Sequence, residues 1–251
     1  MAAALITGAS SGIGREIARI LSDMGYDLIL AARRTDRMEE LARTLKTHVQ
    51  IVGTDLAQAE NCIALYEKCK NSDVEIVVNN AGFGSFGEFC RGKLEDDLTM
   101  IDLNVRAVHI LTKLFLNDFT EKNKGKILNV ASAAGFMPSG PLLSEYYATK
   151  AYVLSLTRGI AKELKKSKSG VRVCALCPGP VKTEFNAVAG VSFASAGMDC
   201  KTVARAAVSG MMRGKTVIIP GLMMKFGKFF AKILPDCLLA EFAYGFQKSK
   251  K

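Results

Sequence analysis

Short apolar runs alternate along the chain with longer segments in which apolar residues recur every three or four positions. The short runs are typical of buried strands, and the longer spacing is typical of amphipathic helices. The expected strands are residues 3–7, 27–32, 49–54, 75–79, 126–131, 171–176 and 216–219. The expected helices are residues 12–24, 36–46, 59–70, 94–120 and 145–167, while residues 185–214 are irregular to helical.

This alternation of strands and helices predicts an α/β protein. Strands that alternate with helices pair in parallel, and helices then cover both faces of the sheet. Their crossovers are right-handed, so we expect a Rossmann-type, doubly wound sheet of seven parallel strands. No linker or repeat interrupts the pattern. Residues 1–220 should therefore form a single catalytic domain, and residues 221–251 an amphipathic helical tail packed on this domain or on a partner subunit.

The apolar content does not predict a membrane protein. The chain has 251 residues, and no run approaches the roughly 20 apolar residues of a membrane-spanning helix. The apolar run 2–6 is too short for a signal peptide and leads directly into a glycine-rich segment. We therefore expect an intracellular, cytoplasmic protein.

The seven cysteines are an odd number and are scattered along the chain, which favours free thiols over disulfides. Cys174 and Cys177 have the spacing of a redox or metal pair, but they fall in a predicted strand. Side chains three positions apart on a strand point to opposite faces, so we interpret both as buried thiols. No second Cys or His pair supports a zinc site.

The net charge of +10 could indicate nucleic acid, an anionic membrane or anionic ligands. Residues 158–172 concentrate this charge, with six basic residues against the single acid Glu163. No nucleic-acid motif accompanies them. A solvated helix face is the favoured explanation, and we expect no nucleic-acid partner.

A glycine-rich turn joins the first strand to the first helix. Its sequence runs from Thr7 to Gly14 with glycines at Gly8, Gly12 and Gly14. Glycines at these positions permit a sharp turn and let the backbone approach a pyrophosphate at the helix N-terminus. The alternative, a tight turn without a ligand, is disfavoured by the strand–turn–helix context. The intervening residues expected to contact the dinucleotide are Ser10, Ser11 and Ile13.

The end of the second strand indicates which dinucleotide binds. An acidic residue there normally holds the ribose 2′-hydroxyl of NAD, but this segment continues as Arg33 and Arg34. Two guanidinium groups suit a 2′-phosphate, which predicts NADP(H). The alternative is a pair of surface arginines. Arg15 is a further candidate for this contact, although exposure on a helix explains it equally well.

Tyr146 and Lys150 are the candidate proton-transfer pair. Residues four apart on a helix share a face, and a nearby ammonium lowers the pKa of a phenol. The spacing alone proves little, because Tyr66 with Lys70 and Tyr244 with Lys248 have it too. Position distinguishes Tyr146: it follows Ser132 at the end of the fifth strand, and ligands in open parallel sheets bind at the carboxyl ends of strands.

With these motifs the chain closely resembles the short-chain dehydrogenase/reductase family over about residues 2–220. Besides the glycine turn, Ser132, Tyr146 and Lys150, four further family motifs are present. They are Asp55-Leu56, Asn79-Asn80-Ala81-Gly82, Asn104, and Pro178-Gly179 followed by Val181 and Thr183. The loop from Ser132 to Tyr146 is one residue longer than the commonest form.

The resemblance implies a role for each matching residue. Tyr146 would exchange a proton with the substrate oxygen, and Ser132 would orient that oxygen. Lys150 would bind the nicotinamide ribose and lower the pKa of Tyr146, while Asn104 would hold a water that links Lys150 to solvent. The adenine would contact Asp55 and Leu56. Val181 and Thr183 would hold the nicotinamide carboxamide. Further contacts to the cofactor would come from Asn80, Ala81, Gly82, Pro178 and Gly179.

The loops around these positions contain many apolar residues, which favours a lipophilic substrate over a sugar or a small anion. Some of these side chains could instead belong to the core. The residues in question are Phe83, Phe86, Phe89, Phe136, Met137, Leu142, Leu143, Phe185 and Phe193.

The tail predicts two helical segments, residues 222–234 and 238–246, separated by Pro235. The first places Lys225, Lys228 and Lys232 on one stripe and apolar residues elsewhere. Such a tail could cap the pocket, lie in a homodimer or homotetramer interface, or contact an anionic membrane peripherally. A lid or an interface is favoured, because apolar helices usually pack on protein.

The function favoured by the sequence is the NADP(H)-dependent interconversion of a lipophilic ketone or aldehyde and an alcohol. Close alternatives are a 3-oxoacyl reductase and a hydroxysteroid dehydrogenase. An NADP-binding sensor or scaffold without turnover is the alternative of a different class, and the presence of all four expected catalytic residues disfavours it.

Overall fold

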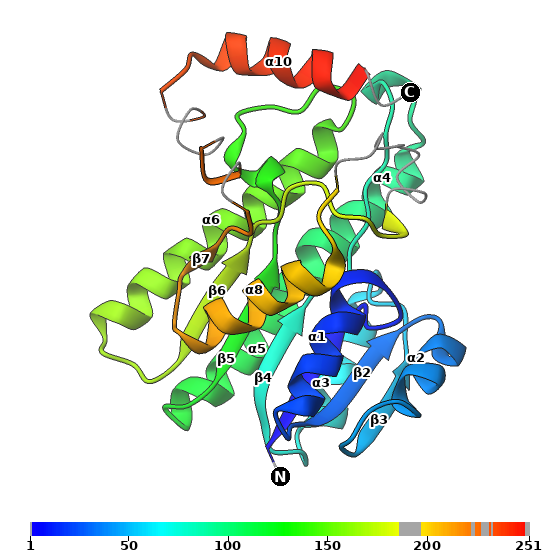
Figure 1. The fold of residues 1–251 in the computed structure, drawn as a ribbon, viewed down its shortest axis with the longest axis vertical. Helices are drawn as coiled ribbons and strands as arrows, with labels where there is room; N and C mark the ends of the chain where they lie inside the picture. Colours follow the sequence, from blue (N-terminus) through cyan, green and yellow to red (C-terminus); the bar gives the residue numbers. More distant parts are fainter. Residues whose placement is uncertain (1, 186–196, 222–223, 227–230, 232, 249–251) are drawn as a thin grey trace.

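The computed structural model describes residues 2–185, 197–221, 224–226, 231 and 233–248. Seven parallel strands form one sheet in the order β3-β2-β1-β4-β5-β6-β7 (Figure 1). The strands are β1 (Ala3–Thr7), β2 (Asp27–Ala32), β3 (Val49–Gly53), β4 (Val74–Asn79), β5 (Lys126–Val130), β6 (Arg172–Leu176) and β7 (Val217–Ile218). The strand order reverses direction between β1 and β4, which confirms the predicted doubly wound, Rossmann-type sheet.

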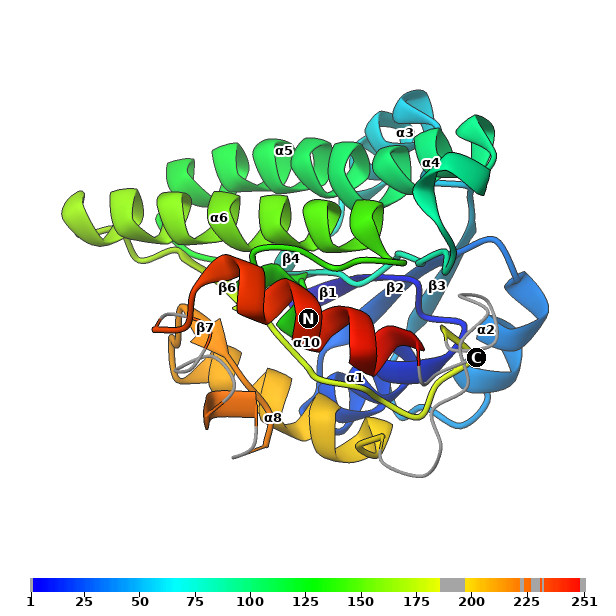
Figure 2. The same cartoon turned by 90° about the horizontal axis from the view of Figure 1, so that it is seen from above.

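Helices cover both faces of this sheet. Figure 2 shows α3 (Ala59–Cys69), α4 (Leu94–Ile101), α5 (Val108–Glu121) and α6 (Ser144–Lys166) over one face. The other face is covered by α1 (Gly12–Asp23), α2 (Thr35–Ala42) and α8 (Cys200–Met212). The last helix, α10 (Asp236–Lys248), crosses the carboxyl end of the sheet instead of either face. No helix within the described ranges is long and apolar enough to cross a membrane.

Alternate residues of each strand enter separate cores. Ile6 of β1 packs into the cluster beneath α1 and α8, whereas Leu5 packs into the cluster beneath α3 and α5. Cys174 and Cys177 are both buried, in different clusters, as their spacing on a strand predicts. This packing on both faces fixes the register of the parallel strands, whose carboxyl ends therefore lie at the same edge of the sheet.

Two predicted helices differ from the observed ones. The segment expected as one helix over 94–120 contains a π-helical turn, η2 (Asp102–Ala107), between α4 and α5. The helix expected over 36–46 ends at Ala42, because the Thr44 hydroxyl donates to the Leu41 carbonyl and the Lys46 amide donates to the Ser22 hydroxyl. Two 3-10 turns, η1 (Phe89–Arg91) and η3 (Ala133–Phe136), interrupt loops near the carboxyl edge.

Candidate active site

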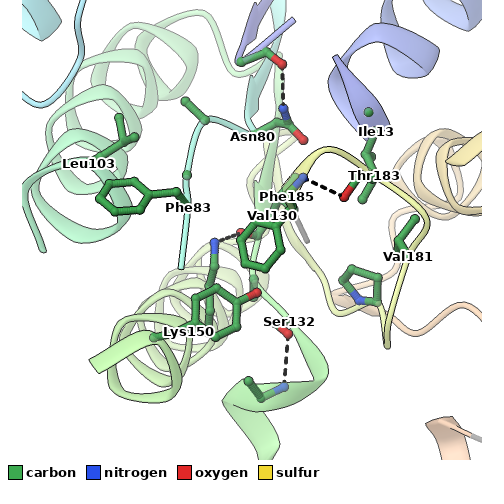
Figure 3. Close-up of a pocket in the computed structure, with 18 of the residues that line it drawn as sticks. Ile13, Asn80, Phe83, Leu103, Val130, Ser132, Lys150, Val181, Thr183 and Phe185 are labelled. Carbon is green, nitrogen blue, oxygen red and sulfur yellow. Dashed lines mark hydrogen bonds between the residues drawn. The ribbon is translucent and has the colours of Figure 1, made fainter. Parts of the chain in front are cut away.

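A cavity of about 690 Å³ opens at the carboxyl ends of the strands. The glycine turn, the loops after β2, β4, β5 and β6, and α10 all contribute to its walls. Figure 3 shows residues from the turn and from the loops after β4, β5 and β6. This is the position that a doubly wound sheet reserves for a ligand, outside the strand ends where the order reverses. Side chains from distant parts of the sequence therefore meet in one space.

The glycine turn is packed too closely for side chains. Gly8 has φ +65°, and a Cβ there would lie 2.9 Å from the Cα of Ala81. The Asn80 side chain donates to the carbonyls of Thr7 at 3.0 Å and Gly8 at 3.1 Å, which ties the loop after β4 to the turn. Gly14 packs against Gly8 behind the cavity wall, so its contribution is to packing.

The start of α1 offers a cradle for a phosphate. Its N-cap residue Ser11 makes no side-chain capping hydrogen bond, so the first turn of the helix has no internal acceptor for its amides. A Cβ at Gly12 would lie 3.2 Å from the Thr183 methyl carbon, so a side chain there would narrow the space. The residues present thus fit the pyrophosphate of a dinucleotide.

No acid follows β2 at the cavity wall, where Ala32, Arg33 and Arg34 lie. The Arg34 guanidinium donates to the hydroxyls of Ser10 and Ser11, each at 3.3 Å. It also donates to the Glu184 carboxylate at 2.9 Å, and Arg37 pairs with the same carboxylate. Hydrogen bonds from Arg37 and Arg34 lower the pKa of Glu184. Neither Arg37 nor Glu184 was predicted.

The remaining residues expected to contact the dinucleotide also gather here. They line the same cavity at Asp55, Leu56, Asn80, Ala81, Gly82, Pro178, Gly179, Val181 and Thr183. Asp55 accepts a hydrogen bond from the Ala57 amide at 3.1 Å, which shapes the turn after β3. The matching motifs therefore share one surface, although they span 129 positions of the chain from Asp55 to Thr183.

Ser132, Tyr146 and Lys150 all line the cavity, and Figure 3 shows Ser132 and Lys150 in it. Burial raises the pKa of Tyr146 to about 12, and a hydrogen bond with Ser132 opposes this increase only in part. Lys150 donates to the Val130 carbonyl at 2.9 Å, and its Nζ lies 5.7 Å from the centre of the Tyr146 ring. The expected lowering of the Tyr146 pKa is therefore not found in the protein alone, because burial dominates.

Lys150 is itself strongly affected by burial, which lowers its pKa to about 8. Asn104 lies behind it on the π-helical turn and is fully buried. The Asn104 amide donates to the Phe83 carbonyl at 2.8 Å and to the Thr149 hydroxyl at 3.2 Å, while its oxygen accepts from the Phe83 amide at 3.1 Å. Asn104 thus anchors the loop after β4 and does not line the cavity.

The other two Tyr–Lys pairs lie elsewhere. The Tyr66 hydroxyl donates to Asp118 at 2.8 Å, on the outer side of the sheet between α3 and α5. Tyr244 lies on α10 and is 40 % exposed. Of these three tyrosines, only Tyr146 lines the cavity, as its place after the fifth strand predicted.

The outer part of the cavity is mainly apolar. Five of the predicted pocket residues line it, namely Phe83, Phe136, Met137, Leu143 and Phe185. Phe86, Phe89 and Leu142 do not, and Phe89 is 67 % exposed on η1, so these three predictions are wrong. Phe193 lies outside the described residues.

Helix α10 adds side chains that the sequence did not identify as pocket residues. Phe242, Ala243, Phe246 and Gln247 line the cavity, and Gln247 donates to the Tyr147 hydroxyl at 2.8 Å. Met224 and Tyr147 also contribute. The only signal for α10 in the sequence was the apolar spacing of residues 238–246, which did not specify what the helix covers.

Comparisons with known proteins all match this chain to short-chain dehydrogenases and related reductases. The family model for short chain dehydrogenases matches residues 2–190. The 3-oxoacyl-acyl-carrier-protein reductase FabG of Rickettsia prowazekii is 34 % identical over 181 residues, which cover 72 % of this chain and 73 % of the relative.

Solved structures resemble most of the chain. A short-chain dehydrogenase from Sphingobium yanoikuyae in complex with NADPH has a TM-score of 0.84 and 31 % identity, covering 93 % of both chains. The bulky-bulky ketone specific alcohol dehydrogenase from Comamonas testosteroni has a TM-score of 0.80 and 29 % identity, covering 93 % of this chain and 92 % of that one. The likeness thus extends over most of the chain.

Proposed function

The chain belongs to the short-chain dehydrogenase/reductase family of oxidoreductases, and on this premise we propose that it interconverts a lipophilic ketone or aldehyde and the corresponding alcohol with NADP(H). The observation that supports this most directly is the meeting of Ser132, Tyr146 and Lys150 in the same cavity as the glycine turn. A bound nicotinamide dinucleotide would supply or accept the hydride.

Tyr146 is the proposed proton donor to the substrate oxygen. Its raised pKa keeps the phenol protonated at neutral pH, so it can donate during reduction. Ser132 would hold the same oxygen, since its hydroxyl already lies within hydrogen-bonding distance of Tyr146. In the oxidative direction the phenolate must form, and the ammonium of Lys150 would stabilise it.

Lys150 and Asn104 have proposed positioning roles. The bond from Lys150 to the Val130 carbonyl holds the ammonium beside the Tyr146 ring. Asn104 fixes the backbone at Phe83, and a Cβ at neighbouring Gly82 would lie 2.7 Å from the Asn104 oxygen and 3.4 Å from the Lys150 Nζ. Asn104 and Lys150 thus both pack against Gly82, and this shared neighbour supports a proton relay that runs from Lys150 past Asn104.

The proposed preference for NADP(H) rests on the residues after β2. Arg33 and Arg34 line the cavity where an acid would select NAD, and a guanidinium binds a phosphate through paired hydrogen bonds. The Sphingobium yanoikuyae structure, which contains NADPH, supports the same choice.

The proposed substrate is lipophilic because aromatic and aliphatic side chains surround the space beside Tyr146. Helix α10 closes this space, so we assign residues 221–251 as a lid on the catalytic domain formed by residues 1–220. The Comamonas testosteroni enzyme, described as specific for bulky-bulky ketones, is consistent with a roomy apolar pocket.

Reduction of a 3-oxoacyl thioester is the second candidate, because the Rickettsia prowazekii relative has that activity in its name. Oxidation of NADPH should be measured with bulky aryl ketones, oxo-steroids and 3-oxoacyl thioesters at equal concentration. Turnover confined to ketones supports the proposal. Turnover confined to thioesters replaces it with the second candidate, and no turnover with any carbonyl contradicts both.

A further inference from the structure

We propose that Glu184 is an internal competitor for the site of the cofactor 2′-phosphate, and that Arg37 joins Arg34 in that site. The inference rests on the proposed use of NADP(H). It adds a specificity-determining acid and a second arginine to the residues that distinguish NADP(H) from NAD(H).

Glu184 bridges the cavity between segments far apart in the sequence. Its Oε2 accepts from Arg34 at 2.9 Å, and its Oε1 accepts from Arg37. The two arginines lie 150 and 147 positions away in the chain. Each carboxylate oxygen thus has a different guanidinium, and the two guanidiniums converge on one anionic group.

This point of convergence has the chemistry of a phosphate site. Arg34 also donates to the Ser10 and Ser11 hydroxyls, so it is held against the glycine turn. Arg15 and Lys182 line the adjoining cleft with Arg37, and the one other acid that lines it is Glu16, so basic side chains outnumber acidic ones around Glu184. Two guanidiniums beside serine hydroxyls suit a phosphate monoester better than a single carboxylate, since the phosphate has more charge and one more acceptor oxygen.

A 2′-phosphate and the Glu184 carboxylate cannot both occupy this point. The hydrogen bonds from Arg37 and Arg34 lower the pKa of Glu184, so its carboxylate is ionised at neutral pH and repels a second anion. The side chains of Arg34, Arg37 and Glu184 are 45 %, 38 % and 45 % exposed, so water can solvate Glu184 once it leaves. Exchange of one anion for another is therefore feasible without unfolding the loop.

The exchange should also reach the substrate pocket. Glu184 lies between Thr183 and Phe185, and the Phe185 amide donates to the Thr183 hydroxyl at 3.2 Å. The Phe185 ring is 5.3 Å from the Tyr146 ring, centre to centre. When a phosphate displaces Glu184, its ion pairs with Arg34 and Arg37 no longer hold the segment 183–185, which contacts Tyr146 through Phe185. NAD(H) has no 2′-phosphate and leaves these ion pairs in place.

The test compares binding of NADPH and NADH, followed by the fluorescence of the reduced nicotinamide, which needs no turnover. Glu184→Gln keeps the size of the side chain and removes its charge. Exposed ion pairs are individually weak, so we expect the Kd for NADPH to fall by roughly three- to tenfold. The Kd for NADH should change less than about twofold. Arg37→Ala should raise the Kd for NADPH selectively.

Glu39→Gln is the matched control, because it removes one exposed negative charge from α2, the helix that carries Arg37, without breaking the ion pairs of Glu184. It should leave both dissociation constants nearly unchanged. Glu184→Ala is a second variant with the same expected direction. An unchanged Kd for NADPH in both Glu184 variants, or an equal fall for the two cofactors, overturns the proposal.

The same measurements test the role of Glu184 and the proposed preference for NADP(H) independently. If the unmodified protein binds both cofactors equally and Glu184→Gln then favours NADPH, the competitor is supported while the original preference is contradicted. If the unmodified protein already prefers NADPH and Glu184→Gln changes nothing, the preference stands and the competitor is overturned.

Discussion

Gln247 donates a hydrogen bond of 2.8 Å to the Tyr147 hydroxyl and thereby joins helix α10 to the residue beside Tyr146. Gln247 is only 1 % exposed, and burial raises the pKa of Tyr147 while this hydrogen bond lowers it. The bond therefore lies in the wall that α10 contributes to the cavity. It connects the tail to the helix that presents the proposed proton donor.

Replacing Gln247 with Leu should loosen the lid. The substitution leaves the buried Tyr147 hydroxyl without this partner, at a cost of about 1–3 kcal/mol. We expect KM for a bulky ketone to rise by roughly fivefold or more, because closure over the substrate becomes less favourable. KM for a small ketone should rise less. Steady-state kinetics with both ketones would measure the difference.

Glu241→Gln is the control for this variant, since Glu241 is an exposed residue on the same helix. Equal increases of KM for small and bulky ketones in Gln247→Leu would contradict a lid that contacts bulky substrates. Tyr147→Phe removes the same hydrogen bond from the other side and should reproduce the pattern.

Replacing Tyr146 with Phe should reduce kcat by at least about a hundredfold, the usual contribution of a general acid. NADPH binding should remain within a few-fold of the unmodified protein, because the aromatic ring and its packing against Phe185 persist. Single-turnover kinetics and nicotinamide fluorescence measure the two properties separately.

Tyr244→Phe is a matched control. Tyr244 also has a lysine four residues later, and the Lys248 Nζ lies 5.9 Å from its ring, close to the 5.7 Å between Lys150 and the Tyr146 ring. Its kcat should be unchanged because Tyr244 does not line the cavity. Retained turnover in Tyr146→Phe would refute the proton-donor role.

The sheet and the inner part of the site were predictable because they depend on local patterns. Apolar runs located each strand, and Gly8 and Gly12 marked the turn whose positive φ values the structure contains. Ser132 and Tyr146 could be paired because topology alone brings the ends of parallel strands to one edge. These inferences needed no knowledge of side-chain packing.

The outer part of the site was not predictable because it depends on contacts between remote segments. Glu184 meets Arg34 across 150 positions, and Gln247 meets Tyr147 across 100, with no periodicity that links either pair. The pKa of Tyr146 was misjudged for a related reason: the degree of burial is a property of the packed structure, and here it outweighs the hydrogen bond with Ser132.

Replacing Arg33 with Ala should weaken NADPH binding more than NADH binding. Arg33 lines the cavity directly after β2, and hydrogen bonds between charged groups contribute about 1.5–3 kcal/mol each. We therefore expect the Kd for NADPH to rise by roughly tenfold or more, with little change for NADH. Arg43→Ala, at the exposed end of α2, serves as the control. Equal increases for the two cofactors would remove the basis for the preference.

Replacing Lys150 with Met should inactivate the enzyme yet stabilise its fold at neutral pH. Burial lowers the pKa of Lys150 from 10.5 to about 8, so protonating this residue is harder in the folded than in the unfolded chain. At about 1.4 kcal/mol per tenfold change in proton affinity, the charged lysine costs the fold about 3 kcal/mol below pH 8. Lys150→Met removes this cost but also loses the hydrogen bond to the Val130 carbonyl, which lowers the stability gained by about 1 kcal/mol.

The sign of the pH dependence follows from the two proton affinities. Between pH 8 and 10.5 the unfolded chain binds more protons at Lys150 than the folded chain, so the stability of the unmodified protein rises with pH relative to Lys150→Met. The advantage of Lys150→Met, about 2 kcal/mol at pH 7, should therefore disappear towards pH 10.5. Ionisation of the tyrosines away from Lys150 affects both proteins alike and cancels in the difference.

Urea unfolding at pH 7 and pH 10 would measure this difference. Lys162→Met, at an exposed position on the same helix, should show no comparable gain at either pH. A Lys150→Met protein that is less stable than the unmodified one at pH 7 would mean that the ammonium is stabilised by contacts stronger than its bond to Val130. The buried charge of Lys150 would then stabilise the folded protein instead of destabilising it.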